Sequence, residues 1–295
     1  MNTKQFKYVL TLADEHSFSS AADVLNITQP SLSQYIKKVE REVGTELFER
    51  TNGDVRLTDA GRAYIEIGRK MLDLEHQLEA QLSDIATFRS GTISVGVSAH
   101  RSVALMPPVV SAFKNIYSGI TLQIVEKKRH ELIEAAEHGE FDLVITTLPV
   151  DEMLFNTELL FVEENIIATS VPITSQVCLD GKIPVIEAAA LNGLSFAMLN
   201  EEHLMQKELE ELIRTHNLKL HKEVECTSLE TLVEMVKEGL GAAFIPACLA
   251  KEPSLHYYSI KENVPKREIV LMYRKEQYLS KAVLDLKNIM HTVLG

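Results

Sequence analysis

The chain has 295 residues, of which 45% are apolar and 24% charged, and its mean hydropathy is -0.01. This length predicts about two domains, each large enough to bury a core without metals or disulfides. The 30 Lys and Arg against 42 Asp and Glu give a net charge of -12, which excludes a generalised polyanion binder but not one basic patch. Three scattered cysteines imply no disulfide framework, and no apolar run is long enough to span a bilayer. These features predict a cytoplasmic, multidomain protein.

Three short amphipathic patterns predict three helices before Gly44. Ser17 supplies an N-cap for the second helix and Thr28 for the third, in which Pro30 occupies an early position that costs no hydrogen bond. Their inward-facing apolar residues are Phe6, Val9, Leu10 and Ala13; Phe18, Ala21, Ala22 and Leu25; and Leu32, Ile36, Val39 and Val43. Two short helices joined by a turn of about three residues are the geometry of a helix-turn-helix.

The outward face of the third predicted helix carries hydrogen-bond donors and cations, with no carboxylate before Glu40. Gln pairs with adenine edges, Ser contacts bases or phosphates, and Lys neutralises phosphate, so this face predicts a helix that reads DNA. A small helical bundle with a merely solvated polar face would show the same spacing. The expected DNA contacts on this helix are Thr28, Gln29, Pro30, Ser31, Ser33, Gln34, Lys37 and Lys38.

An Asn52-Gly53 turn between two short β-capable runs predicts a hairpin after the third helix. Such a wing would place Arg50 and Arg56 beside the DNA backbone or minor groove. Residues 1–58 hold seven Lys and Arg and eight Asp and Glu, a net charge of -1. We therefore expect weak non-specific DNA binding with a modest dependence on salt.

Four short motifs follow one another along this module. They are Ala21-Ala22, Thr28-Gln29-Pro30-Ser31-Leu32-Ser33, Leu47-Phe48-Glu49-Arg50 and Leu57-Thr58-Asp59-Ala60-Gly61. In combination they resemble the winged helix-turn-helix of LysR-type transcriptional regulators, and the resemblance extends through the rest of the chain. That family often has Arg where Gln34 stands, and basic residues near the wing tip where Asp54 stands.

The segment 58–88 reads as one long helix with a seven-residue apolar repeat. Tyr64, Met71, Leu78 and Ile85 form one register, and Ile67, Leu74, Gln81 and Phe88 form the interleaved one. A solitary helix of this length would be marginal and would expose the stripe, so a partner is expected, although the stripe could instead pack on its own domain. The resemblance implies a dimerisation helix that pairs with its copy through Tyr64, Ile67, Met71, Leu74, Leu78, Ile85 and Phe88. Arg89-Ser90-Gly91 is the expected hinge.

After this helix, short β-rich runs alternate with helical patterns, which predicts α/β units with largely parallel sheets. The expected strands are Thr92–Val97, Ile120–Glu126, Phe141–Thr146, Leu194–Leu199, Lys222–Cys226, Ala242–Ile245 and Glu268–Tyr273. The resemblance implies two lobes arranged like a periplasmic solute-binding protein. The complete expectation is an α+β multidomain chain with a winged helix-turn-helix at 1–58, a dimerisation linker helix at 59–90 and an effector-binding domain at 91–295. Lobe I would comprise about 91–161 and 268–295, and lobe II about 162–267.

An effector would bind in the crevice at the carboxyl ends of the strands, where helix N-termini point inward. Cations at helix N-termini oppose the macrodipole, yet His100 and Arg101 and the basic run 127–130 fall near such ends. This mismatch predicts an anionic effector, although the basic run could simply be solvated on a turn. The expected effector contacts are Ser98, His100, Arg101, Ser102, Lys127, Thr146, Thr147, Asn200, Thr227 and Ser228.

Catalytic and metal-binding motifs are absent from the sequence. It has no Gly-rich phosphate loop, Gly-x-Ser-x-Gly elbow, His-Glu-x-x-His or paired Cys-x-x-Cys. Glu201-Glu202-His203 fits a charged helix start better than a metal site, and Cys226 and Cys248 fit small buried hydrophobes better than redox sensors. We therefore expect no enzyme activity, cofactor or metal.

The sequence is thus interpreted as a LysR-type regulator whose operator binding and DNA bending respond to a small anionic effector. The resemblance implies a homodimer that assembles to a homotetramer on double-stranded DNA with an inverted repeat, with RNA polymerase as a further partner. The alternative is a small-molecule-binding or enzymatic α/β protein whose N-terminal helices serve only assembly.

Overall fold

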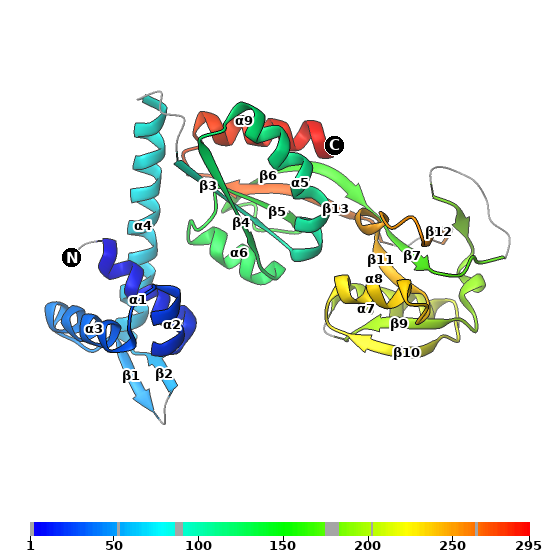
Figure 1. The fold of residues 1–295 in the computed structure, drawn as a ribbon, viewed down its shortest axis with the longest axis horizontal. Helices are drawn as coiled ribbons and strands as arrows, with labels where there is room; N and C mark the ends of the chain where they lie inside the picture. Colours follow the sequence, from blue (N-terminus) through cyan, green and yellow to red (C-terminus); the bar gives the residue numbers. More distant parts are fainter. Residues whose placement is uncertain (1–2, 52–53, 86–90, 175–182, 202, 263–264) are drawn as a thin grey trace.

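The computed structural model describes residues 3–51, 54–85, 91–174, 183–201, 203–262 and 265–295. Its N-terminal module consists of α1 (Thr3–Glu15), α2 (Phe18–Val24), α3 (Gln29–Val43), β1 (Phe48–Thr51) and β2 (Asp54–Leu57), followed by α4 (Asp59–Ile85). The three predicted helices and the hairpin are confirmed. Figure 1 shows α4 rising from this module toward the first of two lobes.

The predicted caps begin and end the helices of the module. The side chain of Ser17 accepts a hydrogen bond from the Ser20 amide at 3.4 Å, and Thr28 accepts one from the Ser31 amide at 3.4 Å. Gly44 ends α3 at a φ of 84°, a left-handed conformation that glycine adopts without strain. The core of the module gathers apolar side chains from α1, α2, α3, the hairpin and the start of α4.

The exposed apolar row on α4 differs from the predicted seam at its first position. Tyr64 is buried against Phe6 of α1, with ring centroids 5.0 Å apart, so this tyrosine belongs to the core of its own module. The exposed row consists of Ile67, Met71, Leu74, Leu78 and Leu82. The row therefore continues from Leu78 to Leu82, four residues later, and not to Gln81 of the predicted repeat. A straight α-helix drifts from a strict seven-residue repeat, which accounts for this difference. Phe88, the expected hinge at 89–90 and the side chain of Ile85 lie outside the described residues.

Lobe I is a five-stranded sheet with helices packed on it. Its elements are β3 (Gly91–Val97), α5 (Ala99–Ile116), β4 (Ile120–Glu126), α6 (Arg129–Glu137), β5 (Leu143–Thr147), β6 (Phe155–Glu163), β13 (Arg267–Arg274) and α9 (Lys281–Leu294). The strand order is β4-β3-β5-β13-β6, in which β3 is parallel to β4 and β5, and β13 is antiparallel to β5 and β6. The chain therefore leaves lobe I after Glu163, two residues beyond the expected crossing near 161.

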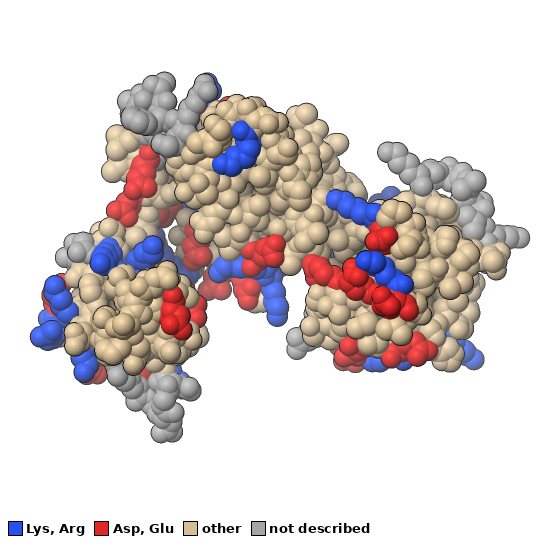
Figure 2. All heavy atoms as spheres, viewed as in Figure 1, with Lys and Arg blue, Asp and Glu red and all other residues tan. Residues whose placement is uncertain are grey.

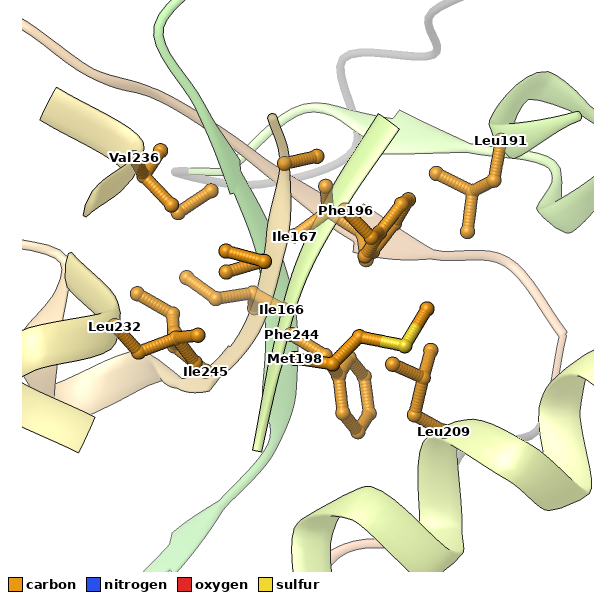
Figure 3. Close-up of a cluster of buried hydrophobic side chains, with 14 of the residues drawn as sticks. Ile166, Ile167, Leu191, Phe196, Met198, Leu209, Leu232, Val236, Phe244 and Ile245 are labelled. Atoms are coloured by element: carbon orange, nitrogen blue, oxygen red, sulfur yellow. The ribbon is translucent and has the colours of Figure 1, made fainter. Parts of the chain in front are cut away.

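Lobe II is built from the chain between the two crossings. Its elements are β7 (Asn165–Thr169), β8 (Val185–Ile186), η1 (Ala188–Leu191), β9 (Ser195–Leu199), α7 (Leu204–Thr215), β10 (His221–Cys226), α8 (Leu229–Lys237), β11 (Ala243–Pro246), η2 (Ala247–Leu249) and β12 (His256–Ile260). Strand β9 is parallel to β10, and a parallel bridge between Phe196 and Ala242 joins them to the order β11-β7-β12-β8. Figure 3 shows Leu209 of α7 on one side of these strands and Leu232 and Val236 of α8 on the other.

The expectation of largely parallel sheets is wrong for the middle of lobe II. Strand β7 pairs antiparallel with both β11 and β12, because the chain enters the lobe on β7 and returns beside it. The sequence reading also missed β6, β7, β8 and β12. Within the described ranges, no helix is long and apolar enough to cross a membrane.

Candidate functional site

The exposed face of α3 brings together the residues predicted to contact DNA. Thr28 and Ser31 stand at its N-terminus, where their hydroxyl oxygens lie 2.7 Å apart and the first turn contains no acidic residue. Gln34, Lys37 and Lys38 follow on exposed positions of the same helix. Open amide groups at this N-terminus attract phosphate, so α3 offers both a backbone anchor and side chains for base edges.

A groove of about 1610 Å³ runs between α3 and the first strand of the hairpin. Its lining includes Ser31, Gln34, Lys37 and Lys38 together with Arg41 of the last helical turn, which the sequence reading did not select. Arg41 lies four residues after Lys37, a spacing that places both on one helix face and could have identified it. Figure 2 shows Lys and Arg gathered over the part of the module where α3 lies, while acidic side chains are prominent on lobe II in the same view.

The two carboxylates of α3 have structural partners. Glu40 accepts hydrogen bonds from the backbone amides of Leu47 at 2.9 Å and Phe48 at 3.2 Å, which fixes the start of the hairpin against α3. Glu42 accepts a hydrogen bond from Gln5 of α1. Glu42 also lies 3.9 Å from Lys38, and Glu46 and Glu49 line the groove, so its positive charge is concentrated on Lys37, Lys38 and Arg41 of α3.

The hairpin places one of its two predicted arginines on its described surface. Arg56 is exposed on β2 and pairs in register with Glu49 on β1. The side chain of Arg50 and the turn at 52–53 lie outside what the structure describes. The arrangement therefore supports one basic wing position directly.

At the crossing between the lobes, five polar residues from five elements form what we call the hinge cluster. Its members are Arg101 of α5, Glu163 of β6, Asn165 of β7, Glu208 of α7 and Arg267 of β13. Arg101 donates to Glu163 at 2.6 Å, and both side chains are buried. Arg267 donates to Asn165 at 2.6 Å and lies 3.5 Å from Glu208. The cluster thus ties both lobes to the two strands that connect them.

Two atoms of the hinge cluster are buried and unpaired. Arg101 Nε and Glu163 Oε1 are buried with no hydrogen-bond partner among the described residues. A cavity of about 430 Å³ lies at this crossing, lined by Glu163, Cys248, Lys266 and apolar side chains such as Leu105. Because unpaired buried polar atoms are costly, a polar ligand in this cavity that paired with Glu163 would be stabilised.

Two histidines near the hinge cluster are held in the neutral form. Burial lowers the pKa of His100 to about 3, and the positive charges of Arg101 and Arg267 add to the effect. Burial also lowers the pKa of His203, whose Nδ1 accepts a hydrogen bond from the Met205 amide at the start of α7. Burial raises the pKa of Glu208. The region therefore favours neutral groups beside its two buried ion pairs.

Several of the other predicted effector residues have structural partners. Ser98 begins α5 and accepts a hydrogen bond from Arg101 at 3.5 Å, and the neighbouring Ser102 is buried. Thr147 accepts a hydrogen bond from Arg129 at 3.1 Å, and Ser228 caps α8. The remaining positions are Thr146, buried in β5, Asn200, which follows β9, and Thr227, exposed before α8.

The basic run 127–130 belongs to the surface of lobe I. Lys127 lies 3.9 Å from Glu140, and Arg129 donates to the carbonyl oxygens of Thr147 and Pro149. Lys128 and His130 are exposed. These contacts favour the alternative that the run is solvated on a turn, and Arg101 is likewise already paired with Glu163. None of the ten predicted effector residues lines the described 430 Å³ cavity.

The sequence reading missed Glu163, Asn165, Glu208 and Arg267. A signal for them was present, because the polar segment Glu163-Glu164-Asn165 interrupts two apolar runs at one crossing and Arg267 stands at the other. Polar residues at both points where a chain changes lobes are expected to meet, since the two connecting strands lie side by side there.

The described cysteines and acidic groups do not form a redox or metal site. Burial raises the pKa of both Cys226 and Cys248, which keeps them as thiols, whereas reactive cysteines have a lowered pKa. Cys178 and Glu202 lie outside the described residues. Over the ranges that the structure describes, no group of three His, Cys, Asp or Glu could hold a metal ion.

Comparisons with known proteins cover nearly the whole chain. Residues 3–62 match the family of bacterial regulatory helix-turn-helix proteins of lysR type, and residues 86–295 match the LysR substrate binding domain. The HTH-type transcriptional regulator YcgK of Bacillus subtilis (strain 168) is 29% identical, and the match covers 95% of this chain and 91% of that protein.

Solved structures of similar proteins share the same architecture. A full-length OxyR variant from Pseudomonas aeruginosa has a TM-score of 0.68 at 25% identity, covering 100% of this chain and 94% of that one. Full-length CbnR in complex with its target DNA has a TM-score of 0.66 at 18% identity, covering 99% and 100% of the two chains. At 18% identity, the similarity to CbnR shows a shared fold.

Proposed function

This chain belongs to the LysR family of transcriptional regulators, and on that premise we propose that it is a homodimer that reads an inverted-repeat operator with α3 and bends the DNA in response to a small anion. A LysR-type regulator has a DNA-binding helix-turn-helix and an effector-binding domain, and this chain has both. The observation that carries the proposal is the exposed face of α3, where Gln34, Lys37 and Lys38 stand beside a capped N-terminus free of acidic residues.

The proposed dimer is formed by the exposed apolar row of α4. Ile67, Met71, Leu74, Leu78 and Leu82 lie on one helix and are each at least 43% exposed in the single chain. Such a row is a seam for a second copy, and two copies present two α3 helices to one duplex. Assembly of dimers into a tetramer and contact with RNA polymerase are further parts of the proposal, as is action in the cytoplasm.

The proposed effector site is the hinge cluster with the residues that surround it. Arg101 Nε offers a buried donor, and Arg267 adds a second guanidinium beside neutral His100 and His203. Ser98, Asn200 and Thr227 border the same crossing in the proposed arrangement. An anion that bridges the lobes there would change how they sit on each other, and hence the spacing of the DNA modules.

The reading helix is tested by replacing single side chains on its exposed face. An operator is first selected from random-sequence DNA with the wild-type protein. Gln34→Ala is then expected to weaken binding to that operator by about 5- to 150-fold, the range that corresponds to one bidentate base contact of about 1–3 kcal/mol. Ser33→Ala is expected to weaken binding as well, and neither change should alter the oligomeric state.

Gln123→Ala is the matched control, because Gln123 is exposed on β4 of lobe I, far along the chain from α3. It should leave operator affinity unchanged. Footprints of both α3 variants that match the wild type in strength and extent would show that another surface reads the DNA.

A further inference from the structure

Linker helix α4 contacts lobe I through one polar face. Arg69, Asp73 and His76 are spaced along that face at i, i+4 and i+7. Arg69 lies 3.6 Å from Glu140, Asp73 accepts from Arg274 at 2.5 Å, and the Nε2 of His76 lies 3.1 Å from a carboxylate oxygen of Asp142. We call these three pairs the linker interface.

The linker interface is closely packed. Asp73 and Asp142 are only 9% and 4% exposed, although both are charged side chains. Gly139 has a φ of 78°, and a Cβ added there would lie 2.5 Å from the carboxyl carbon of Asp73. The turn before β5 can therefore approach α4 this closely only because glycine stands at this position.

The interface also reaches the DNA-binding module. The guanidinium of Arg69, which faces Glu140 of lobe I, donates to Asp14 at the end of α1 at 2.9 Å. Its side chain is 16% exposed, so the arginine is held between the two partners. One residue of α4 thus touches both the DNA-binding module and the effector domain.

Three central strands of lobe I connect the linker interface to the hinge cluster. β13 carries Arg274 at one end and Arg267 at the other. β5 begins beside Asp142 and is antiparallel to β13, so its two ends match those of β13. Along β3, Ser94 donates to Asp142 at 2.8 Å through its amide and at 3.0 Å through its hydroxyl, and the strand runs on to Val97 and the start of α5.

We propose that the linker interface is the coupling contact of this regulator. It fixes lobe I on α4, so that a change at the hinge cluster is carried along the sheet to the orientation of the DNA-binding module. This role rests on the proposed effector site at the hinge cluster. A packed sheet moves as a unit, and ion pairs at its edge either hold or release the helix, which supplies the two discrete arrangements that coupling requires.

The charge balance of the interface supports this role. Each carboxylate on one side faces a cationic or protonatable partner on the other: Asp73 faces Arg274, and Asp142 faces His76. The hydrogen bond to Asp142 raises the pKa of His76, which favours the charged form of that pair. Such a polar contact can release without exposing a large apolar surface, unlike the core of either domain.

The interface is tested in the full-length protein by removing one partner of its shortest pair. Asp73→Asn and Arg274→Gln should each raise amide hydrogen exchange in the turn 138–142 by about tenfold, because that turn loses its contact with α4. The double variant should exchange no faster than either single variant, since the two residues act as one pair. Lys70→Gln is the control, because Lys70 is exposed on α4 and pairs with Glu66 of the same helix.

The coupling is tested with the same variants on the operator selected by the wild-type protein. Both single variants should change the length or position of the DNase footprint while binding within about threefold of wild-type affinity, because α3 is untouched. Unchanged exchange in the turn 138–142 would overturn the linker interface, and faster exchange with an unchanged footprint would overturn its coupling role. If the wild-type protein selects no DNA, the proposed function fails, and the exchange comparison still decides whether α4 is held by lobe I.

Discussion

The Arg101–Glu163 pair has a geometry that stability alone does not require. Both side chains are almost fully buried, and each keeps one polar atom without a partner among the described residues. Replacing a buried ion pair by packed apolar residues is often neutral or stabilising, because desolvation offsets the attraction between the charges. An incomplete pair beside a cavity therefore suits a ligand that supplies the missing hydrogen bonds. A hydroxyl on a ligand in that cavity would donate to Glu163, which lines it beside Lys266, whereas Arg101 Nε lies behind the lining.

The neutral form of His100 should make stability depend on pH. The folded pKa of about 3 lies below the ordinary histidine value of 6.5, so between these values the unfolded chain binds a proton that the folded chain does not. The contribution of neutral His100 to the free energy of unfolding is therefore fully present above pH 6.5 and is lost as the pH falls toward 3. His100→Asn should flatten the dependence of urea midpoints on pH in this window.

The control for this prediction is His256→Asn, which replaces an exposed histidine on β12. It should leave the wild-type slope unchanged. A His100→Asn protein whose urea midpoints fall with pH as steeply as those of the wild type would show that His100 titrates normally in the folded state.

At the scale of elements, local signals predicted the N-terminal half well. The caps at Ser17 and Thr28 and the glycine that ends α3 are determined by neighbouring residues, so their positions could be read from the chain. Tyr64 shows the limit of the same approach. Its spacing fits the heptad, but contact with Phe6 of α1 decides which face it occupies, and that contact is between residues far apart in the sequence.

Replacing two leucines of the α4 row should dissociate the dimer. Leu74 and Leu78 are 62% and 56% exposed in the single chain, so Glu is tolerated there without loss of the fold. Each leucine buried between copies contributes about 1.5–3 kcal/mol, and the double variant removes this from both chains. Leu74→Glu with Leu78→Glu should therefore sediment as a monomer at concentrations where the wild type is a dimer.

Glu79→Lys changes a charge on α4 at an exposed position outside both the predicted seam and the exposed apolar row, and serves as the matched control. It should sediment as the wild type does. An unchanged mass for the double leucine variant would assign dimerisation to another surface.

For the whole molecule, alternating patterns predicted α/β units and the family resemblance implied two lobes, but neither predicted which side chains meet between the parts. Ser98 and Ser228 were correctly predicted at the starts of α5 and α8 because helix starts are local features, and Ser228 makes the capping hydrogen bond. The hinge cluster depends on the pairing of β13 with β6 and on the contact of Arg267 with Asn165 at the start of β7, and neither β6 nor β7 was predicted. The linker interface likewise joins Asp73 to Arg274 across 201 positions of sequence, a separation that no periodicity reports.

Ligand binding at the hinge cluster should appear as increased thermal stability of the full-length protein. The screen would use sulfate and nitrate, aromatic and aliphatic carboxylates, phosphorylated metabolites and amino acids. A ligand at about 100 times its dissociation constant stabilises the folded state by about 2.7 kcal/mol, which raises the melting temperature by roughly 5–10 °C for a domain of this size. We expect an anionic compound to produce this shift, because the cluster offers two guanidinium groups and an unpaired donor.

Ser98→Ala and Arg267→Gln should each reduce the shift, whereas Ser118→Ala, at an exposed turn after α5, should not. A shift produced only by neutral or cationic compounds would contradict the anionic effector, and an anion whose shift survives both variants would place the site away from the crossing between the lobes.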